Sequence, residues 1–169
     1  MGIRSKLGVI AFCLTCLLLH VRRANSSAEV VKKLSVTFAK AMDACKKELN
    51  VGDHILQEMQ NFWREEYDLV HRDTGCMLTC MAAKHDLIVI TEDRMHHENA
   101  HAFAKAHGAD DDLAKQIVTM LHDCESDNPQ QEDFCLRALA VAKCFKTKIH
   151  ALKWAPSMEE LLSEVMSDM

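Results

Sequence analysis

The chain has 169 residues, 49% of them hydrophobic and 27% charged, which is enough for one domain with a buried core. Four of its 20 Lys and Arg residues and none of its 25 Asp and Glu residues precede Ser27, so the chain from residue 27 onward has a formal net charge of −9, with its nine histidines counted neutral. This acidic balance excludes nucleic acid as a partner, and no run after residue 26 is long or apolar enough to cross a membrane.

The first 26 residues are typical of a secretory signal peptide. A short basic start is followed by a 13-residue apolar run, residues 7–19, which is too short to span a bilayer. Ala24 and Ser26 are small residues at the spacing that signal peptidase prefers. We therefore expect cleavage after Ser26, secretion, and a single domain over residues 27–169. An uncleaved membrane anchor is the alternative.

The hydrophobic pattern predicts helices along almost the whole remaining chain. Apolar residues recur every three or four positions over residues 31–49, 113–124 and 134–149. Strand-like alternation is confined to the short stretch 87–90. The sequence therefore predicts an all-α fold.

Turn and cap residues divide this helical pattern. Gly108 predicts the end of one helix, and Asp110 predicts the N-cap of the next. The Ser-Asp-Asn-Pro sequence at residues 126–129 predicts a loop. Pro156 predicts the end of the helix that runs toward Trp154.

Six cysteines remain after residue 26, and an even number in a secreted chain predicts three disulfides. A zinc site is the alternative, but the chain has only one closely spaced cysteine pair, C-x3-C, and no second pair to complete such a site. Cys76 and Cys80 lie one helical turn apart with nearly parallel side chains, so each is expected to reach a different helix. Spacing leaves most of the fifteen possible connectivities open. The six are Cys45, Cys76, Cys80, Cys124, Cys135 and Cys144.

Staples between helices can hold open an interior that packing alone would tend to close. Aromatic residues are few, and methionine, which adapts to irregular apolar surfaces, is frequent. This composition is compatible with an internal cavity and equally compatible with an ordinary methionine-containing core.

The cysteine spacing C-x30-C-x3-C-x43-C-x10-C-x8-C is similar to that of the insect odorant-binding proteins, whose signature is the x3 and x8 spacing. The strings KAMDACKKEL, NFWREEY, TGCMLTC, FAKAHGAD and CFKTKIHALKWAPSM narrow the resemblance to the moth pheromone-binding proteins. It covers residues 27–169. The general odorant-binding proteins of moths are close relatives and the alternative subgroup.

This resemblance implies a six-helix, disulfide-stapled fold around an apolar cavity, with a C-terminal amphipathic tail over residues 157–169. It also implies the pairing Cys45–Cys80, Cys76–Cys135 and Cys124–Cys144.

The same resemblance implies a carrier without enzymatic activity or a cofactor. The carrier is expected in the extracellular fluid around sensory neurons, the sensillum lymph, and its ligand is a long-chain alcohol, acetate or aldehyde. The olfactory receptor, the neuronal membrane and a second copy of the chain are the expected further partners. A general odorant-binding protein with a broad ligand range, and a structural protein acting through its acidic surface, are the alternatives.

The resemblance also indicates which residues contact the ligand, with plain core packing as the alternative for each. Relatives often have Ser where Ala82 stands, and a methyl group cannot bond the polar end of a ligand. Thr79, Ser35 and Arg137 are candidate substitutes. The loop from His85 to Met95 is one residue longer than in relatives. The expected ligand-binding residues are Phe38, Phe62, Trp63, Leu78, Ala82, Met95, Phe103, Val118, Leu121, Val141 and Phe145.

The sequence His97-Glu98-Asn99-Ala100-His101 matches the H-E-x-x-H motif of zinc peptidases, with His107 at the position of a third ligand. On a continuous helix, however, His107 points away from the other two histidines. The glycine that lets the chain turn back to the metal is replaced by Ala104. A zinc-dependent peptidase is therefore the weaker interpretation, and we expect neither catalytic residues nor a metal site.

The C-terminal tail and three histidines suggest a pH switch. Apolar residues at three- and four-residue intervals form one stripe, and carboxylates occupy the other face. We expect these charges to resist entry into an apolar cavity until they are protonated, when the tail forms a helix and displaces the ligand. His96, His97 and His122 match the family's pH-sensing positions, and repulsion between charged His96 and His97 is expected to loosen the adjacent loop. The stripe comprises Met158, Leu161, Leu162, Val165, Met166 and Met169, and the carboxylates are Glu159, Glu160, Glu164 and Asp168.

Overall fold

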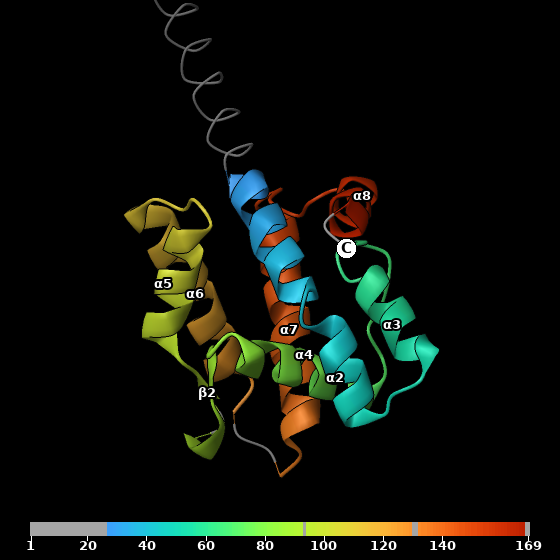
Figure 1. The fold of residues 1–169 in the computed structure, drawn as a ribbon. Coiled ribbons are helices and arrows are strands. Elements are labelled where there is room, and N and C mark those ends of the chain that lie inside the picture. The colour runs from blue at the N-terminus through green and yellow to red at the C-terminus, as the bar shows by residue number, and fades with distance from the viewer. Residues whose placement is uncertain (1–26, 93, 130–131, 168–169) are drawn as a thin grey trace, which may run out of the picture.

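The computed structural model describes residues 27–92, 94–129 and 132–167 (Figure 1). The expected signal peptide, residues 1–26, lies outside the described residues, as do Asp168 and Met169. Residues 27–39 are helical, and the later elements are α2 (Met42–Leu49), α3 (Asp53–Gln60), α4 (Arg72–Lys84), β1 (Ile88–Val89), a 3-10 turn (Ile90–Glu92), β2 (Arg94–Met95), α5 (His97–Ala106), α6 (Asp111–Asp127), α7 (Phe134–Ala151) and α8 (Met158–Ser167).

The fold is mainly α-helical, as the hydrophobic pattern predicts. The described residues form eight helical stretches rather than six, because a turn at Lys40–Ala41 separates residues 27–39 from α2 and the tail forms α8. The strand-like stretch near residue 88 is a minimal antiparallel ladder, in which Ile88 pairs with Met95 and Val89 with Arg94.

Helix ends follow local chemistry in part. The side chain of Asp110 caps α6 as expected, since its Oδ1 accepts a hydrogen bond of 2.8 Å from the Leu113 N–H. The predicted loop at residues 126–129 is wrong at its start, because α6 continues through Asp127. α7 ends at Ala151, before Trp154.

α4 and α7 form the centre of the molecule. In Figure 1 they lie between α5 and α6 on one side and α3 and α8 on the other. Gly75 of α4 faces the backbone carbonyl of Cys135 at the start of α7 so closely that a Cβ atom would overlap it. The missing side chain therefore sets the distance at which the two helices cross.

Three disulfides join the helices in the pairs that the resemblance implies. Cys76–Cys135 links α4 to α7 with a Cα–Cα distance of 4.6 Å. Cys80 instead bonds Cys45 of α2, so the two cysteines one turn apart on α4 reach different helices. Cys124–Cys144 links α6 to α7.

A buried carboxylate fixes the chain between α3 and α4. Glu58 accepts hydrogen bonds from the Thr74 hydroxyl and from the N–H groups of Val70 and His71. Its Oε1 also lies 2.8 Å from Nδ1 of the His71 ring. Burial works to raise the pKa of Glu58, but these hydrogen bonds outweigh it and hold that pKa below its usual value of 4.5. The ionised carboxylate thus ties the segment before α4, and the Thr74 side chain in its first turn, to α3.

Within the described ranges, the helices are all too short or too polar to cross a membrane.

Candidate functional site

An internal cavity of about 720 Å³ is the most prominent candidate site. Its lining is mostly apolar and comes from residues 27–39, from α2 to α8 and from both short strands. Cavities of this size and composition are typical of sites for small apolar ligands.

Ten of the eleven expected ligand-binding residues line this cavity. The exception is Val118, which packs against the cluster of Ala82, Leu87 and Ala100. On α6, Ile117 and Leu121 face the cavity and Val118 lies one residue beyond that face. The ten are Phe38, Phe62, Trp63, Leu78, Ala82, Met95, Phe103, Leu121, Val141 and Phe145.

The aromatic part of the lining is held by hydrogen bonds as well as packing. The Trp63 Nε1–H donates to Ser35 Oγ at 2.9 Å, and the Ser35 hydroxyl donates to the Val31 carbonyl at 2.8 Å. The Phe62 ring meets the Trp63 ring edge-on, with centroids 4.9 Å apart. Ser35 is therefore already engaged in fixing Trp63.

Of the other two candidate polar contacts, Arg137 has hydrogen-bond partners in the protein and Thr79 has none among the described residues. Arg137 donates from Nε to the Asn128 carbonyl at 2.9 Å and from Nη2 to the Glu125 carbonyl at 3.5 Å. The Thr79 hydroxyl oxygen is buried beside the cavity and has no hydrogen-bond partner among the described residues. A buried hydroxyl without a partner is costly unless something else bonds it.

The tail forms a helix, α8, in the structure. Five apolar residues of α8 line the cavity, and the first two of them are buried: Met158, Leu161, Leu162, Val165 and Met166. The carboxylates of Glu159, Glu160 and Glu164 are not among the residues that line the cavity. Glu164 lies 3.2 Å from Lys32 Nζ, and Glu159 lies 3.4 Å from Arg64 Nη2.

The ionised state of one α8 carboxylate is locally favoured. Hydrogen bonds from the Glu159 backbone N–H and the Ser157 hydroxyl, with Arg64 nearby, lower the pKa of Glu159 from 4.5. Its ion pair therefore persists in mild acid.

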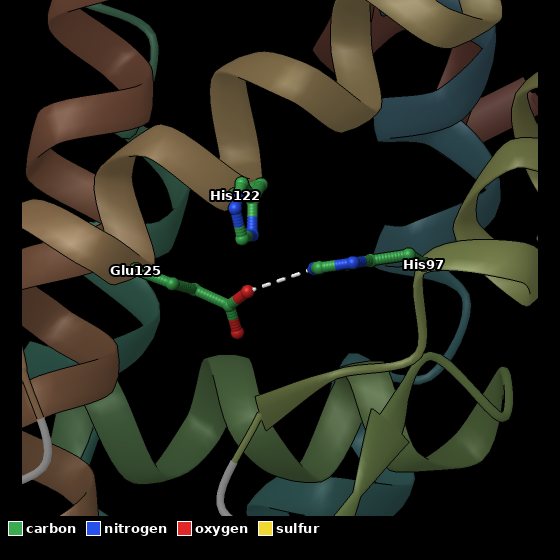
Figure 2. Close-up of side chains that lie close together, drawn as sticks. All are labelled: His97, His122 and Glu125. Atoms are coloured by element: carbon green, nitrogen blue, oxygen red, sulfur yellow. Dashed lines mark hydrogen bonds and ion pairs between the residues drawn. The ribbon is translucent and has the colours of Figure 1, made fainter.

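The three expected pH-sensing histidines lie where β2 meets α5 and α6. His96 Nδ1 accepts the Asn99 N–H at 3.3 Å and so caps α5. His97 Nε2 lies 3.0 Å from Glu125 Oε2, and the His97 ring meets the His122 ring edge-on (Figure 2). His96 and His97 thus have separate partners, and the partner of His97 is a carboxylate.

Glu125 connects this group to the cavity lining. Its Oε1 accepts the Met95 N–H at 2.5 Å, and both Glu125 and Met95 line the cavity. Sequence reasoning missed Glu125, because it lies 28 residues from His97 and no local pattern marks the contact.

The H-E-x-x-H histidines do not converge. His101 Nε2 lies 3.4 Å from Asp111 Oδ1, an ion-pair distance without hydrogen-bond geometry. His107 contacts the Phe103 carbonyl through Nδ1 and Thr37 Oγ1 through Nε2. With three separate sets of partners, His97, His101 and His107 do not form the metal centre of a peptidase.

Comparisons with known proteins agree with this geometry. The model of the PBP/GOBP family matches residues 27–148. The chain is 42% identical to pheromone-binding protein 2 of Epiphyas postvittana over 160 residues, covering 95% of this chain and 96% of that protein. It is 36% identical to general odorant-binding protein 2 of Heliothis virescens, covering 78% of this chain and 81% of that protein. The crystal structure of Epiphyas postvittana pheromone-binding protein 3 superposes with a TM-score of 0.62 at 46% identity, covering 69% of this chain and 98% of that one.

Proposed function

The chain belongs to the PBP/GOBP family, and from this premise we propose that it is a non-enzymatic carrier that binds a small hydrophobic odorant or pheromone in its internal cavity. The cavity of about 720 Å³ is the observation that carries the proposal. Each methylene group moved from water into such a lining contributes about 0.8 kcal/mol. A ligand with a dozen methylenes therefore reaches micromolar affinity after the costs of association.

The ligand class that suits this cavity is a long chain with one polar end, an alcohol, acetate or aldehyde. The ten lining residues named above enclose its hydrocarbon part. Thr79 is the polar anchor, because Ala82 has no hydroxyl and the groups of Ser35 and Arg137 already have protein partners. The unpartnered Thr79 hydroxyl donates to the oxygen of the ligand.

A competition experiment tests this assignment. The purified protein is loaded with a fluorescent apolar probe, which is then displaced by alcohols, acetates and aldehydes of equal chain length. Thr79→Val keeps the shape of the side chain and removes its hydroxyl, so affinity for all three classes should fall about fivefold relative to a hydrocarbon of that length.

Thr147→Val is the matched control, since the Thr147 hydroxyl bonds the Lys143 carbonyl on the exposed side of α7. Ala82→Ser adds the hydroxyl that relatives often have and should change the preference among the three head groups. Equal affinities for Thr79→Val and the unaltered protein would remove Thr79 as the anchor. Failure of every apolar competitor would remove the carrier function and favour a protein that acts through its acidic surface.

The site of action follows from the expected signal peptide. Cleavage after Ser26 releases the domain into the extracellular fluid, where the sensillum lymph supplies ligand and the olfactory receptor or the neuronal membrane receives it. N-terminal sequencing of the protein secreted by an insect cell should begin at Ser27. Light scattering of the same sample measures whether it forms a homodimer.

Ligand release is triggered by mild acid. The lowered pKa of Glu159 favours the charged form of this α8 carboxylate. Imidazole is the side chain that ordinarily changes charge near neutral pH, so we assign the trigger to the three histidines. Protonation of His96 Nδ1 removes the acceptor that caps α5. Charge on both His97 and His122 places two cations beside the single carboxylate of Glu125, with Arg94 and Arg137 also lining this side of the cavity.

Loosening of this wall lets α8, whose apolar stripe already faces the cavity, move inward and displace the ligand. Truncation after Pro156 tests the role of α8. The intact protein should lose probe affinity between pH 7 and pH 5, and the truncated protein should lose less. An equal loss in both proteins would show that α8 is not the displacing element.

A further inference from the structure

Three potential metal ligands converge at the junction of α5 and α6, beside the cavity wall that Glu125 helps to line. Figure 2 shows the side chains of His97, His122 and Glu125 pointing toward one another. One ligand atom from each residue lies within 4.8 Å of the other two. His97 comes from the first residue of α5, and the other two come from one face of α6, three residues apart.

We propose that His97, His122 and Glu125 bind a divalent transition-metal ion of the zinc type. Two imidazoles and one carboxylate are a ligand set that zinc uses in proteins, with water completing the coordination. Bond lengths of about 2.0–2.2 Å and tetrahedral angles place two ligand atoms about 3.3 Å apart. The His97 Nε2 to Glu125 Oε2 distance of 3.0 Å is already close to that value.

His122 completes the set of three ligands from the exposed side of the site. Its side chain is exposed and its ring lies edge-on to the His97 ring, so water keeps access to the ion. The side chain of Glu125 is 12% exposed and that of His97 is 33% exposed, so both are more buried than that of His122.

A backbone hydrogen bond also orients the Glu125 carboxylate. Glu125 Oε1 accepts the Met95 N–H, which leaves Oε2 directed at His97. Support of this kind for a ligating carboxylate typically changes metal affinity by 10–100-fold. A bound ion joins the start of α5 to α6 and holds β2 between them, because Met95 is bonded to the same carboxylate.

This site is distinct from the H-E-x-x-H pair. His101 lies one turn after His97 on α5, and its partner is Asp111 rather than Glu125. Its side chain is 32% exposed, nearly the same as that of His97. His101 is therefore a matched control for His97 on the same helix.

The test is calorimetric titration of the untagged, disulfide-intact, metal-free protein with zinc chloride at pH 7.5. One zinc ion per chain is expected. His97→Ala, His122→Ala and Glu125→Gln should each weaken binding at least about tenfold, and His101→Ala should leave it unchanged. Glu125→Gln keeps an oxygen for the Met95 N–H while removing the charge, and circular dichroism checks that each variant is folded.

A second measurement reports ligation directly. Imidazole resonances in the NMR spectrum should shift for His97 and His122 on zinc addition, while those of His101 stay in place. Absence of stoichiometric binding would overturn the proposal. Loss of binding in His101→Ala equal to that in His97→Ala would also overturn it, by assigning the ion to the H-E-x-x-H pair.

Discussion

α7 and α8 are consecutive helices that border the same cavity, yet they are held in different ways. α7 is joined by disulfides to α4 and α6, and its start lies against Gly75. α8 contains no cysteine and is attached through its apolar side chains and two ion pairs, the partly buried Lys32–Glu164 and the exposed Arg64–Glu159. Exposed ion pairs contribute little to stability.

Because of this difference, we expect the stability of the domain and the access of ligand to the cavity to depend on different helices. The disulfides keep α4 and α7 together whether the cavity is filled or not. α8 can leave its position without breaking any covalent link, and such low-stability elements are the ones that open locally. We therefore expect changes on α7 to alter global unfolding and changes on α8 to alter ligand exchange.

Removal of the α4–α7 disulfide should have the largest effect on stability. Replacing Cys76 and Cys135 together by Ala should cost about 2–5 kcal/mol of unfolding free energy, because the reduced chain gains conformational freedom when unfolded. Urea denaturation of the double variant measures the loss.

The Cys124–Cys144 pair is the control for loop length. It spans 20 residues, compared with 59 for Cys76–Cys135, so its removal should cost about 1 kcal/mol less. A larger loss from the shorter loop would show that native packing around Cys124 and Cys144, rather than chain entropy, dominates.

A matched pair of leucines distinguishes the two helices directly. Leu139 of α7 and Leu161 of α8 are 7% and 8% exposed. Leu139→Ala should cost about 2–5 kcal/mol in urea unfolding, as in other well-packed cores. Leu161→Ala should cost less than half as much and should instead speed release of a bound fluorescent probe.

The contrast between α7 and α8 would be lost if both leucine variants lowered the unfolding free energy equally and left the rate of probe release unchanged. That result would mean that α8 unfolds only together with the rest of the domain.

The buried carboxylate of Glu58 should give a smaller effect that depends on pH. Glu58→Gln removes the charge that accepts the hydrogen bonds of Thr74, Val70 and His71, so it should cost about 1–3 kcal/mol at pH 7. Because the pKa of Glu58 is lowered in the folded protein, its stabilising contribution is present above pH 4.5. It is lost as the pH falls through the lower, folded-state value.

The difference in unfolding free energy between the original protein and Glu58→Gln should therefore shrink below pH 4.5. Glu48→Gln is the control, since the Glu48 carboxylate makes an exposed ion pair with Lys84 and should show almost no effect. A difference that stays constant from pH 7 to pH 3 would contradict the role of the charge.

Local pattern was sufficient for some of this fold. The three-and-four spacing of apolar residues predicts most helices, and the residue type of Asp110 predicts that it caps α6. The pairing of the cysteines was open from spacing and followed from the resemblance. Val118 shows that a prediction of lining residues can fail by one position. Its neighbour Ile117 lines the cavity, while Val118 packs against the cluster of Ala82, Leu87 and Ala100.

Long-range contacts were beyond the sequence pattern. The amphipathic stripe of α8 was visible, but its ion pairs with Lys32 and Arg64 were not, and Arg64 lies 95 residues from Glu159 in the sequence. Likewise, the motif at His97 suggested His101 as its partner. In the folded chain, the partner of His97 is instead Glu125 of α6.

The position of Trp63 gives the protein a built-in optical signal. Its indole ring lines the cavity while its N–H is held by Ser35, so a ligand meets the ring face without disturbing that hydrogen bond. The second described tryptophan, Trp154, is buried in the same core but is not among the lining residues. Occupancy of the cavity is therefore expected to change the emission of one indole and leave the other as an internal reference, so filling can be followed without an added dye.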